Sequence, residues 1–454
     1  MAEAIYENLP FENLYWSQME TLPREEMRVL QLERLRKTVD KVRHLPLYRE
    51  FFEKTKLSGD DIRSLDDIRR LPFTTKAQLL ENYPFGHLLI PRHEIARIHG
   101  SSGTKSKPTL MAYTRKDLET WANLCARFLY AGGLRSNHLV QVSFGYGLFT
   151  GGFGLHYGIE CVGAGILPAA AGNTPRQIMF MQDLKTDGLI ATPSYAMNIA
   201  ETVRDMGIKP HELALKFAHF GAEAWTEEMR QVIENLLGIK AFNNYGLSEI
   251  LGPSISGECW YQNGMHIQED NFLIECLDPE TLEPVPEGTP GELVITNLNK
   301  EATSLLRYRT RDIAILDSSP CRCGRTTQRM GRIVGRSDDM VVVRGVNLFP
   351  TQIEEALLRV EGVTPHFLIK VERPGAMDEI TVQVEIQESH FSDKMSDMDE
   401  LRRNILHQIQ VVTGLRVKLE LAAPQTMQRF VGKAKRLEDL RDLHNVQSSQ
   451  GDKK

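Results

Sequence analysis

The stretches LVQVSF, residues 139–144, and GLIAT, residues 188–192, decide the fold class of this chain. Both are short apolar runs with a glycine or a proline beside them, which is typical of buried strands in a parallel sheet. Apolar residues recur at three- and four-residue spacing around residues 178–184 and 229–236, which indicates helices between and after the strands. This alternation predicts an α/β domain with a mostly parallel sheet.

The composition is that of a soluble globular protein. The chain has 454 residues, of which 41% are hydrophobic and 25% charged. With about 100–200 residues per domain, this length indicates two or three domains. The chain has 54 Lys and Arg residues and 60 Asp and Glu residues, which gives a formal net charge of −6. A nucleic-acid-binding protein would normally carry a net positive charge or a basic patch. We find no apolar window of about 18 residues and no signal peptide, so we expect a cytoplasmic protein without membrane contact.

The pattern changes twice toward the C-terminus. From about residue 271 the short strands FLIEC, GELVIT, LLRYRT and DIAIL predict a small β-rich subdomain that extends over about 271–334. After it, a helix, two strands, a second helix and a further strand predict a compact α+β unit of roughly 100 residues. We therefore expect an N-terminal domain at residues 1–337 and a C-terminal domain at residues 338–454.

The segment HGSSGTKSKPT, residues 99–109, is suited to binding an anion. Small hydroxylated residues around Gly103 leave backbone N–H groups open, and Lys105 and Lys107 add positive charge, as in loops that cradle phosphate. The spacing does not match the Walker A pattern. An ordinary solvent-exposed loop is the alternative.

Three further motifs carry groups that a nucleotide-dependent enzyme needs. NNYGLSE, residues 243–249, places an aromatic ring, a glycine and a carboxylate after an apolar strand, where open α/β sheets bind ligands. YRTRD, residues 308–312, ends in a carboxylate suited to a ribose diol. GKAKR, residues 432–436, puts Lys433 on a loop, free to supply charge to a phosphoryl group. Each motif has a structural alternative. Glu249 could be a surface carboxylate, residues 308–312 could form a salt-bridged turn, and residues 432–436 could be a solvated basic stretch.

The cysteines raise the question of a metal. Cys321 and Cys323 form a tight pair on a turn-like segment, and Cys259 and His266 lie upstream on another loop. Three thiolates and an imidazole could close a tetrahedral zinc site without an open position, which would be structural. Free thiols are the alternative, because C-x-C is not the common C-x₂-C spacing. The remaining cysteines stand in apolar contexts and are expected to be buried thiols: Cys125, Cys161 and Cys276.

Taken in their order and spacing, these motifs resemble those of the acyl-adenylate-forming superfamily and, within it, the phenylacetate–coenzyme A ligases. The resemblance covers nearly the whole chain, from the apolar helix face at residues 32–42 to Arg436. It implies a large adenylate-forming N-terminal domain of parallel strands and helices with a β-rich subdomain. It also implies a small mobile α+β C-terminal domain that carries the catalytic lysine and turns about a hinge at Asp338.

The resemblance implies a set of residues that bind ATP and AMP. They are Ser101, Ser102, Gly103, Thr104, Gly221, Ala222, Glu223, Asn244, Tyr245, Gly246, Ser248, Asp312 and Arg336. Within this set, Tyr245 resembles the residue that lies against adenine, and Asp312 resembles the ribose-binding aspartate. Glu249 resembles the glutamate that holds Mg²⁺.

The resemblance implies further roles. The catalytic residues would be Lys433, Glu249 and Thr104. The segment FGYGLFTGG, residues 144–152, resembles the wall that binds a flat apolar acid, with Tyr146, Phe149 and Gly221 as contacts, although its aromatics also suit a core. Arg344 and Gly345 would lie beside coenzyme A. Zinc at Cys259, His266, Cys321 and Cys323 also fits some members of the family.

The chain departs from the family pattern after SSGT, where Lys105-Ser106 stands in place of Thr-Gly. Loss of the glycine could stiffen the loop, and the extra cation could tighten triphosphate binding. The departure leaves the loop conformation and the ATP affinity open.

The resemblance implies an AMP-forming ligase that uses ATP, Mg²⁺ and coenzyme A to convert an aryl acid, with phenylacetate as the family-based expectation. The acid would react with ATP to give an acyl-adenylate and pyrophosphate, and coenzyme A would then displace AMP. An adenylating enzyme with an amine or a carrier protein as acceptor is the first alternative. A non-catalytic nucleotide-binding protein is the second. The resemblance also suggests a homodimer.

Overall fold

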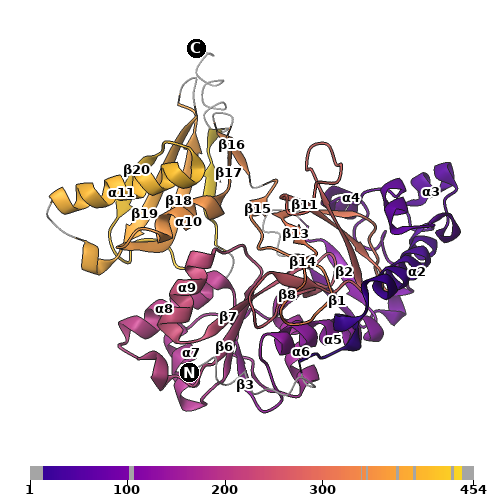
Figure 1. Cartoon of the computed structure of the whole chain (residues 1–454), viewed down its shortest axis with the longest axis horizontal. Helices are drawn as coiled ribbons and strands as arrows, with labels where there is room; N and C mark the ends of the chain where they lie inside the picture. The colour runs from indigo at the N-terminus through magenta and orange to yellow at the C-terminus, as the bar shows by residue number, and fades with distance from the viewer. Residues whose placement is uncertain are drawn as a thin grey trace. The chain divides into compact units, whose positions relative to one another are not determined.

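The computed structural model describes residues 14–101, 107–338, 340–343, 346–374, 378–391, 395–430 and 434–441 (Figure 1). The chain divides into two compact units. The first holds Met1–Ala222 and Leu236–Arg332, and the second holds Glu223–Asn235 and Ile333–Lys454. The boundary at residues 337/338, drawn from the sequence pattern, stays a prediction.

A sheet that has nine strands among the described residues forms the centre of the first unit. One half of it is parallel, in the spatial order β4 (Gly165–Leu167), β3 (Leu139–Val142), β5 (Gly188–Ala191), β6 (Phe217–Gly221) and β7 (Lys240–Leu247). Strands β5 and β6 are buried throughout, as their apolar sequences require. The prediction of a mostly parallel sheet around residues 139–144 and 188–192 is confirmed for this half.

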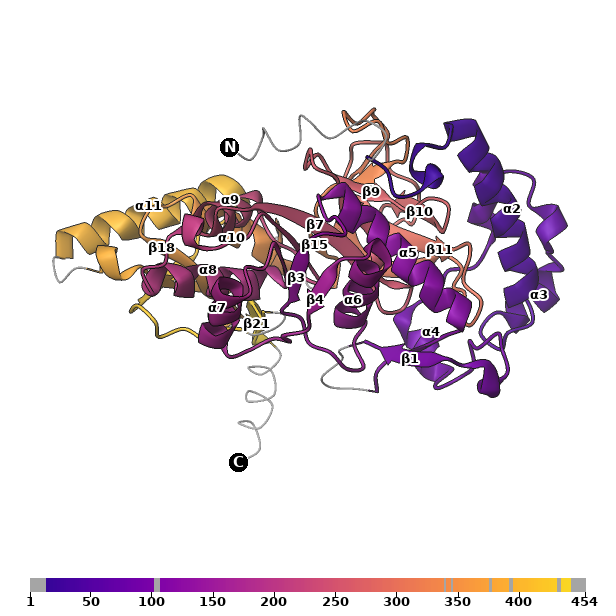
Figure 2. The same cartoon turned by 90° about the horizontal axis from the view of Figure 1, so that it is seen from below.

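The other half of this sheet is antiparallel, which the alternating pattern did not predict. It continues from β7 through β8 (Gly252–Glu258), β9 (Met265–Ile267), β14 (Arg329–Met330) and β13 (Leu316–Asp317). Helices cover both sides of the parallel strands. Figures 1 and 2 show α5 (Arg115–Ala131) and α6 (Gly151–Val162) on one side of β6 and β7, and α7 (Thr174–Asp183) and α8 (Pro193–Asp205) on the other.

The β-rich part of the first unit contains a separate antiparallel sheet. It includes β10 (Phe272–Leu277), β11 (Gly291–Asn297) and β12 (Tyr308–Ala314). LLRYRT and DIAIL were expected to be separate strands, and this is wrong, because β12 runs through both. Arg311 has a φ of +68°, and the register shifts beside it, so a β-bulge replaces the expected turn.

Short elements complete the first unit. The hairpin of β1 (Arg97–Gly100) and β2 (Leu110–Tyr113) flanks the phosphate-loop segment. The N-terminal helices are α2 (Arg24–Val42), α3 (Arg49–Thr55) and α4 (Lys76–Glu81). Among the described residues, the 3₁₀ helices of the first unit are η2 (Gln18–Thr21), η3 (Gly59–Asp61), η4 (Leu65–Arg70), η5 (Arg92–Glu94) and η6 (Pro210–Glu212), and the second unit has η7 (Glu388–His390). The apolar face expected at residues 32–42 packs with Leu35, Val39 and Val42 in one buried cluster.

The second unit contains an α+β core. Its sheet has the order β20 (Lys418–Ala422), β19 (Glu379–Ile386), β18 (Val363–Glu372) and β21 (Leu437–Asp439). Helices α10 (Pro350–Leu358) and α11 (Met395–Thr413) pack with it in one apolar cluster that includes Ile353, Ile369 and Ile405. The short hairpin of β16 (Val341–Val343) and β17 (Val346–Leu348) adds to this cluster. The second unit also includes most of helix α9 (Glu227–Leu237), because Glu223–Asn235 belongs to it.

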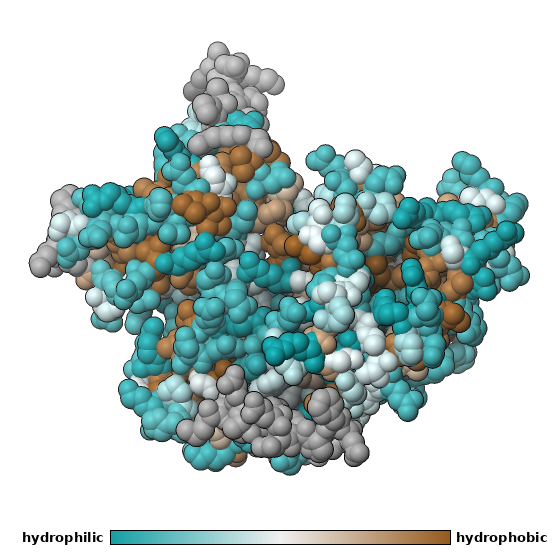
Figure 3. Space-filling model, in the orientation of Figure 1, coloured by the Kyte–Doolittle hydropathy of each residue, from teal (hydrophilic) through white to brown (hydrophobic). Residues whose placement is uncertain are grey.

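The surface is polar on the face drawn in Figure 3, where hydrophilic residues outnumber the apolar ones. Among the described residues, no helix combines the length and the apolar character needed to cross a membrane.

Candidate functional site

The carboxyl ends of β6 and β7 bring two predicted nucleotide-binding segments together. Gly221 pairs with Asn244 across the parallel strands. A Cβ on Gly221 would come within 2.6 Å of the Asn244 carbonyl oxygen, and one on Gly246 would come within 1.8 Å of the Gly252 oxygen. Glycine is therefore the residue that fits at both positions. Ala222 follows with a φ of +77°, which turns the chain sharply away from the strand end.

Tyr245 and Asp312 meet although they are far apart in the sequence. The Tyr245 hydroxyl donates a hydrogen bond of 2.7 Å to Asp312 Oδ2, and both residues are buried. Asp312 lies inside β12, just past the bulge at Arg311. A ring and a carboxylate in this arrangement could receive a base and a ribose diol.

A second set of contacts joins the phosphate-loop segment to the predicted magnesium ligand. The Thr109 hydroxyl lies 2.8 Å from Glu249 Oε1 and 2.9 Å from the Ser101 hydroxyl. Because a carboxylate only accepts, Thr109 donates to Glu249. The predicted contacts Ser102, Gly103 and Thr104 lie outside the described residues, as do Lys105 and Ser106. Thr109 was not selected from the sequence; its only signal was its place at the end of the motif.

Lys300 is a buried cation near this set that the sequence reading also missed. It is 2% exposed, its Nζ donates to the Ile250 carbonyl at 2.8 Å, and it lies 4.4 Å from the centre of the Tyr113 ring. Burial lowers the pKa of Lys300 to about 8, while the charges of Asp117 and Glu249 oppose this shift. Lys300 therefore supplies a buried positive charge that interacts electrostatically with the carboxylate of Glu249.

The predicted acid-binding segment leads into α6, whose first two residues are Gly151 and Gly152. The Tyr146 hydroxyl is 3.1 Å from His156 Nδ1, and its ring packs edge-on to Phe153. Burial raises the pKa of Tyr146 to about 12. At the end of the segment the Thr150 hydroxyl is 3.2 Å from the hydroxyl of Ser248, a predicted nucleotide contact. Tyr146 and Phe149 are both half-buried, as side chains that face a ligand would be.

The four predicted metal ligands lie together. The donor atoms of Cys259, His266, Cys321 and Cys323 are within 4.8 Å of one another, and all four residues are buried. Cys259 Sγ and Cys321 Sγ are 3.8 Å apart, and Cys323 Sγ is 3.3 Å from His266 Nε2. Two sulfurs bound at 2.3 Å to one tetrahedral ion would stand about 3.8 Å apart, whereas a disulfide would bring them to about 2.05 Å. The cluster therefore fits a tetrahedral ion and not a disulfide.

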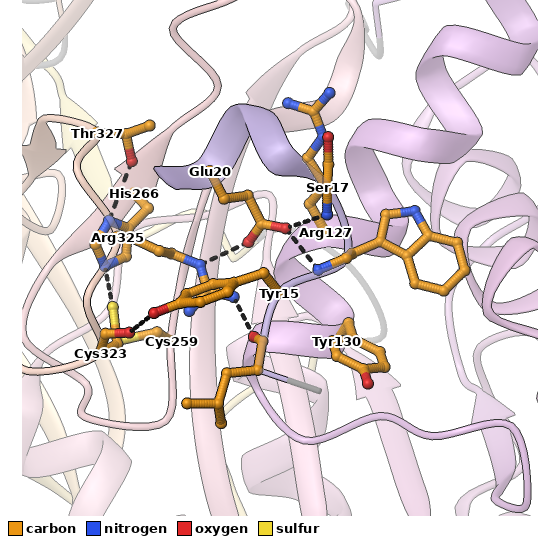
Figure 4. Close-up of polar contacts among 12 residues, drawn as sticks. Tyr15, Ser17, Glu20, Arg127, Tyr130, Cys259, His266, Cys323, Arg325 and Thr327 are labelled. Carbon is orange, nitrogen blue, oxygen red and sulfur yellow. Dashed lines mark hydrogen bonds and ion pairs between the residues drawn. The ribbon is translucent and has the colours of Figure 1, made fainter. Parts of the chain in front are cut away.

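The ring of His266 is oriented for such an ion. Its Nδ1 is 3.2 Å from the Thr327 hydroxyl, which leaves Nε2 toward the sulfurs (Figure 4). Of the other cysteines, Cys125 is buried as expected, whereas Cys276 is only partly buried. The expectation that Cys161 is buried is wrong, because it lies on the outer side of α6 and is exposed.

The N-terminal strap, residues 14–22, contacts the loop that carries Cys323 and Arg325 (Figure 4). The Tyr15 hydroxyl donates to the Cys323 carbonyl at 2.8 Å, and Arg325 Nε donates to Glu20 Oε2 at 2.6 Å. Gly324 has a φ of +80°, and a Cβ there would come within 2.4 Å of the Tyr15 hydroxyl. No sequence pattern predicted this contact between residues 308 positions apart.

The predicted residues of the second unit are described only in part. Arg336 Nε and Nη2 pair with the Asp338 carboxylate at 2.9 and 3.0 Å. Glu223 Oε2 accepts a hydrogen bond of 3.0 Å from the Ala434 N–H. The predicted coenzyme A contacts Arg344 and Gly345 and the predicted catalytic Lys433 lie outside the described residues.

Comparison with known proteins gives a consistent result over the whole chain. Residues 345–441 match the AMP-binding enzyme C-terminal domain. A phenylacetate–coenzyme A ligase from Thermus thermophilus is 45% identical over 443 residues, which cover 94% of this chain and 100% of the relative. A phenylacetate–coenzyme A ligase from Aromatoleum evansii is 43% identical, with 93% of this chain and 96% of the relative covered.

A solved structure has the same fold. The crystal structure of 2-hydroxyisobutyryl-CoA ligase in the postadenylation state, in complex with 2-HIB-AMP, gives a TM-score of 0.90 at 30% identity and covers 98% of this chain and 96% of that one. The fold and the site thus define an adenylate-forming ligase, as the motifs implied. Within that class, the chain belongs to the phenylacetate–coenzyme A ligase family.

Proposed function

We propose that this chain is an ATP-dependent phenylacetate–coenzyme A ligase. In the first step the carboxylate of the acid forms a bond to the α-phosphorus of ATP, and the bond from that phosphorus to the bridging oxygen breaks, which releases pyrophosphate. In the second step the coenzyme A thiolate forms a C–S bond at the acyl carbon and the C–O bond to AMP breaks. The thiol proton passes to solvent, and the products are the thioester and AMP.

The observation that carries the proposal is that the motif at the end of β7 contacts two other predicted motifs. Tyr245 is hydrogen-bonded to Asp312, and four residues further on Glu249 is hydrogen-bonded to Thr109 at the root of the phosphate-loop segment. Tyr245 would lie against adenine, Asp312 would accept hydrogen bonds from the ribose hydroxyls, and Glu249 would hold the Mg²⁺ that arrives with ATP. A protein that only bound a nucleotide would have no need of Lys433 in addition to these residues.

The remaining roles extend this arrangement. Lys433 would stabilise the charge that develops on the transferring phosphate, together with Mg²⁺. A rotation of the C-terminal domain about Asp338 would then remove Lys433 and admit coenzyme A beside Arg344 and Gly345. The further expected nucleotide contacts are Ser101, Ser102, Gly103, Thr104, Gly221, Ala222, Glu223, Asn244, Gly246, Ser248 and Arg336.

The acid would bind against Tyr146, Phe149 and the backbone-thin Gly221. The relatives more than 40% identical over nearly the whole chain are phenylacetate–coenzyme A ligases, whereas the 30% identical structure is of a ligase for a small hydroxy acid. The aromatic residues of the segment favour an aryl acid over that small acid. We also propose that Cys259, His266, Cys321 and Cys323 hold a structural Zn²⁺, which closes the site because four protein ligands leave no open position.

Pyrophosphate release from Mg·ATP tests the proposal. The panel of acids would include phenylacetate, benzoate, a long-chain alkyl acid and 2-hydroxyisobutyrate, each with and without coenzyme A. We expect rapid turnover only with phenylacetate or a close aryl relative plus coenzyme A. Turnover that ignores coenzyme A but follows an added amine would move the function to another acceptor. Size-exclusion chromatography with light scattering would test the homodimer that the resemblance suggests.

A further inference from the structure

The backbone carbonyl of Leu148 accepts two hydrogen bonds from the first two residues of the phosphate-loop segment, His99 and Gly100. The Gly100 N–H donates to this oxygen at 2.9 Å, and His99 Nδ1 lies 3.0 Å from it. Because a carbonyl oxygen only accepts, His99 must carry its proton on Nδ1. Leu148 lies in the middle of the predicted acid-binding segment, so one oxygen connects the acid side of the site to the ATP side.

The acid-binding segment has little else to hold its middle. The Leu148 side chain is 49% exposed, and a Cβ added to Gly145 or Gly147 would meet nothing within 4 Å. Two glycines without neighbouring atoms leave this part of the backbone conformationally free. The segment is otherwise held near its ends, by Tyr146 through its hydroxyl and by Thr150 through Ser248.

His99, in contrast, is held in place by strand pairing and by buried packing. It lies on β1, where it pairs with Met111 of β2, and it is 1% exposed. Its ring packs edge-on to Tyr113 and Trp121, at centroid distances of 5.5 and 5.3 Å. The backbone pairing of β1 and β2 does not depend on the imidazole. Loss of the ring nitrogen would therefore remove one of the two hydrogen bonds to the Leu148 carbonyl and leave the one from the Gly100 N–H in place, without moving the start of the phosphate loop.

His99 also reaches the segment by a second route. Its ring is 5.7 Å from the Phe153 ring, and Phe153 in turn packs edge-on to Tyr146 at 5.3 Å. His99 therefore contacts both the backbone of the acid-binding segment and the aromatic ring that supports Tyr146. His99 Nε2 is buried and has no hydrogen-bond partner among the described residues, so the polar contacts of this side chain there are made through Nδ1.

We propose that His99 is a positioning residue for the acid, which holds the segment at residues 145–150 in its binding conformation from the base of the phosphate loop. The inference rests on the proposed ligase function and deepens it. His99 does not touch the reacting atoms in this account. His99 orders the glycine-rich segment before the acid binds. Binding of the acid then loses less free energy to the conformational entropy of this segment.

Two variants of similar polarity test this role. In His99→Asn the side-chain NH₂ stands near the position of Nδ1 and can still donate to Leu148, whereas in His99→Gln it reaches toward the position of Nε2. We expect His99→Gln to raise the KM for the acid about three- to tenfold, because loss of one hydrogen bond changes affinity by about this factor. The kcat should stay within about twofold of the wild-type value. His99→Asn should restore most of the loss. The KM for ATP should change by less than about twofold in both variants, because β1 and β2 stay paired.

His87 offers a matched control. It is 2% exposed and its Nε2 is 2.7 Å from the Leu110 carbonyl, so His87→Gln alters a similar buried contact that does not involve the acid-binding segment. It should lower the melting temperature but leave the KM for the acid unchanged. An acid KM in His99→Gln equal to that of the wild type, or shifted equally by His87→Gln, would overturn the positioning role and leave the ligase function intact. A wild-type protein without turnover on any acid would overturn both.

Discussion

The hydroxyl of Tyr245 is hydrogen-bonded to the carboxylate of Asp312 at 2.7 Å, with both groups buried. The two residues come from different sheets of the first unit, β7 and β12. The bond fixes the direction of a carboxylate that we assign to the ribose, so the nucleotide site is organised before ATP arrives.

Replacement of Tyr245 by Phe should therefore weaken ATP binding. The variant keeps the ring but loses a hydrogen bond to a charged group, and such bonds are worth about 1.5–3 kcal/mol. We expect the KM for ATP to rise about tenfold or more, while the KM for the acid stays nearly constant. Tyr113→Phe is the matched control, because the Tyr113 hydroxyl is buried without a partner among the described residues. Equal ATP affinity in Tyr245→Phe and the wild type would contradict the assignment.

Replacement of Lys433 by Ala should separate the two half-reactions. We expect loss of adenylation, measured as pyrophosphate release, and near-normal thioester formation from supplied phenylacetyl-adenylate and coenzyme A. The reason is that the lysine stabilises charge on the phosphate only in the first step. Lys435→Ala is the control, since Lys435 is largely exposed and paired with Glu438 at 3.0 Å. Equal loss of activity in both half-reactions would contradict the proposal that Lys433 acts only in adenylation.

Metal removal should loosen the N-terminal strap. The loop of Cys321 and Cys323 lies between the metal cluster and the strap, and the Tyr15 hydroxyl holds the Cys323 carbonyl. Elemental analysis should find one zinc per chain. Treatment with a chelator should then speed chymotryptic cleavage after Tyr15 and Trp16, detected by mass spectrometry. If zinc is present but its removal leaves the cleavage rate unchanged, the strap is held in place independently of the metal.

The coupling should also act in the opposite direction, because linkage is reciprocal. Tyr15→Phe removes one hydrogen bond and should speed zinc transfer to a chromogenic chelator about three- to tenfold. Tyr83→Phe, on an exposed tyrosine, should leave the rate unchanged.

His219 should make the protein acid-sensitive. It lies on β6 with 0% exposure, and burial lowers its pKa to about 3. In the unfolded chain its pKa would be about 6.5, so the unfolded state binds an extra proton between pH 6.5 and pH 3. Stability is therefore unaffected by this group above pH 6.5 and falls by about 1.4 kcal/mol per pH unit below it.

Thermal melting between pH 7 and pH 5 would measure this effect. Between pH 7 and pH 5 the melting temperature of His219→Gln should fall less than that of the wild type, even if the variant has the lower melting temperature at pH 7. His93→Gln is the control, because the His93 side chain is 81% exposed. Parallel pH dependences for the wild type and His219→Gln would show that another group controls the acid response.

The sequence was informative wherever a local pattern or a short motif carried the structure. The buried strands β3 and β5, the C-terminal α+β unit and the four clustered metal ligands all follow from residues 139–144 and 188–192, from periodicity and from cysteine spacing. The adenylate-forming class followed from the order of the motifs. These features depend on neighbours in the sequence or on chemistry that few residue types can perform.

Other features depend on contacts between distant segments and could not be predicted. Thr109 meets Glu249 across 140 residues, and Tyr15 meets Cys323 across 308. The continuity of β12 through Asp312 depends on a bulge at Arg311, a residue with no turn preference of its own. Lys300 is buried only because the fold places it under Tyr113, whereas a lysine in the sequence is normally assigned to the surface.

The most direct test of the central claim is the stoichiometry of one reaction. Purified enzyme would be incubated with Mg·ATP, phenylacetate and coenzyme A, and the products would be quantified by mass spectrometry. We predict phenylacetyl-coenzyme A, AMP and pyrophosphate in a 1:1:1 ratio, with no thioester when ATP is replaced by ADP. Formation of ADP and phosphate, or AMP without the thioester, would contradict the assignment of this chain as an AMP-forming phenylacetate–coenzyme A ligase.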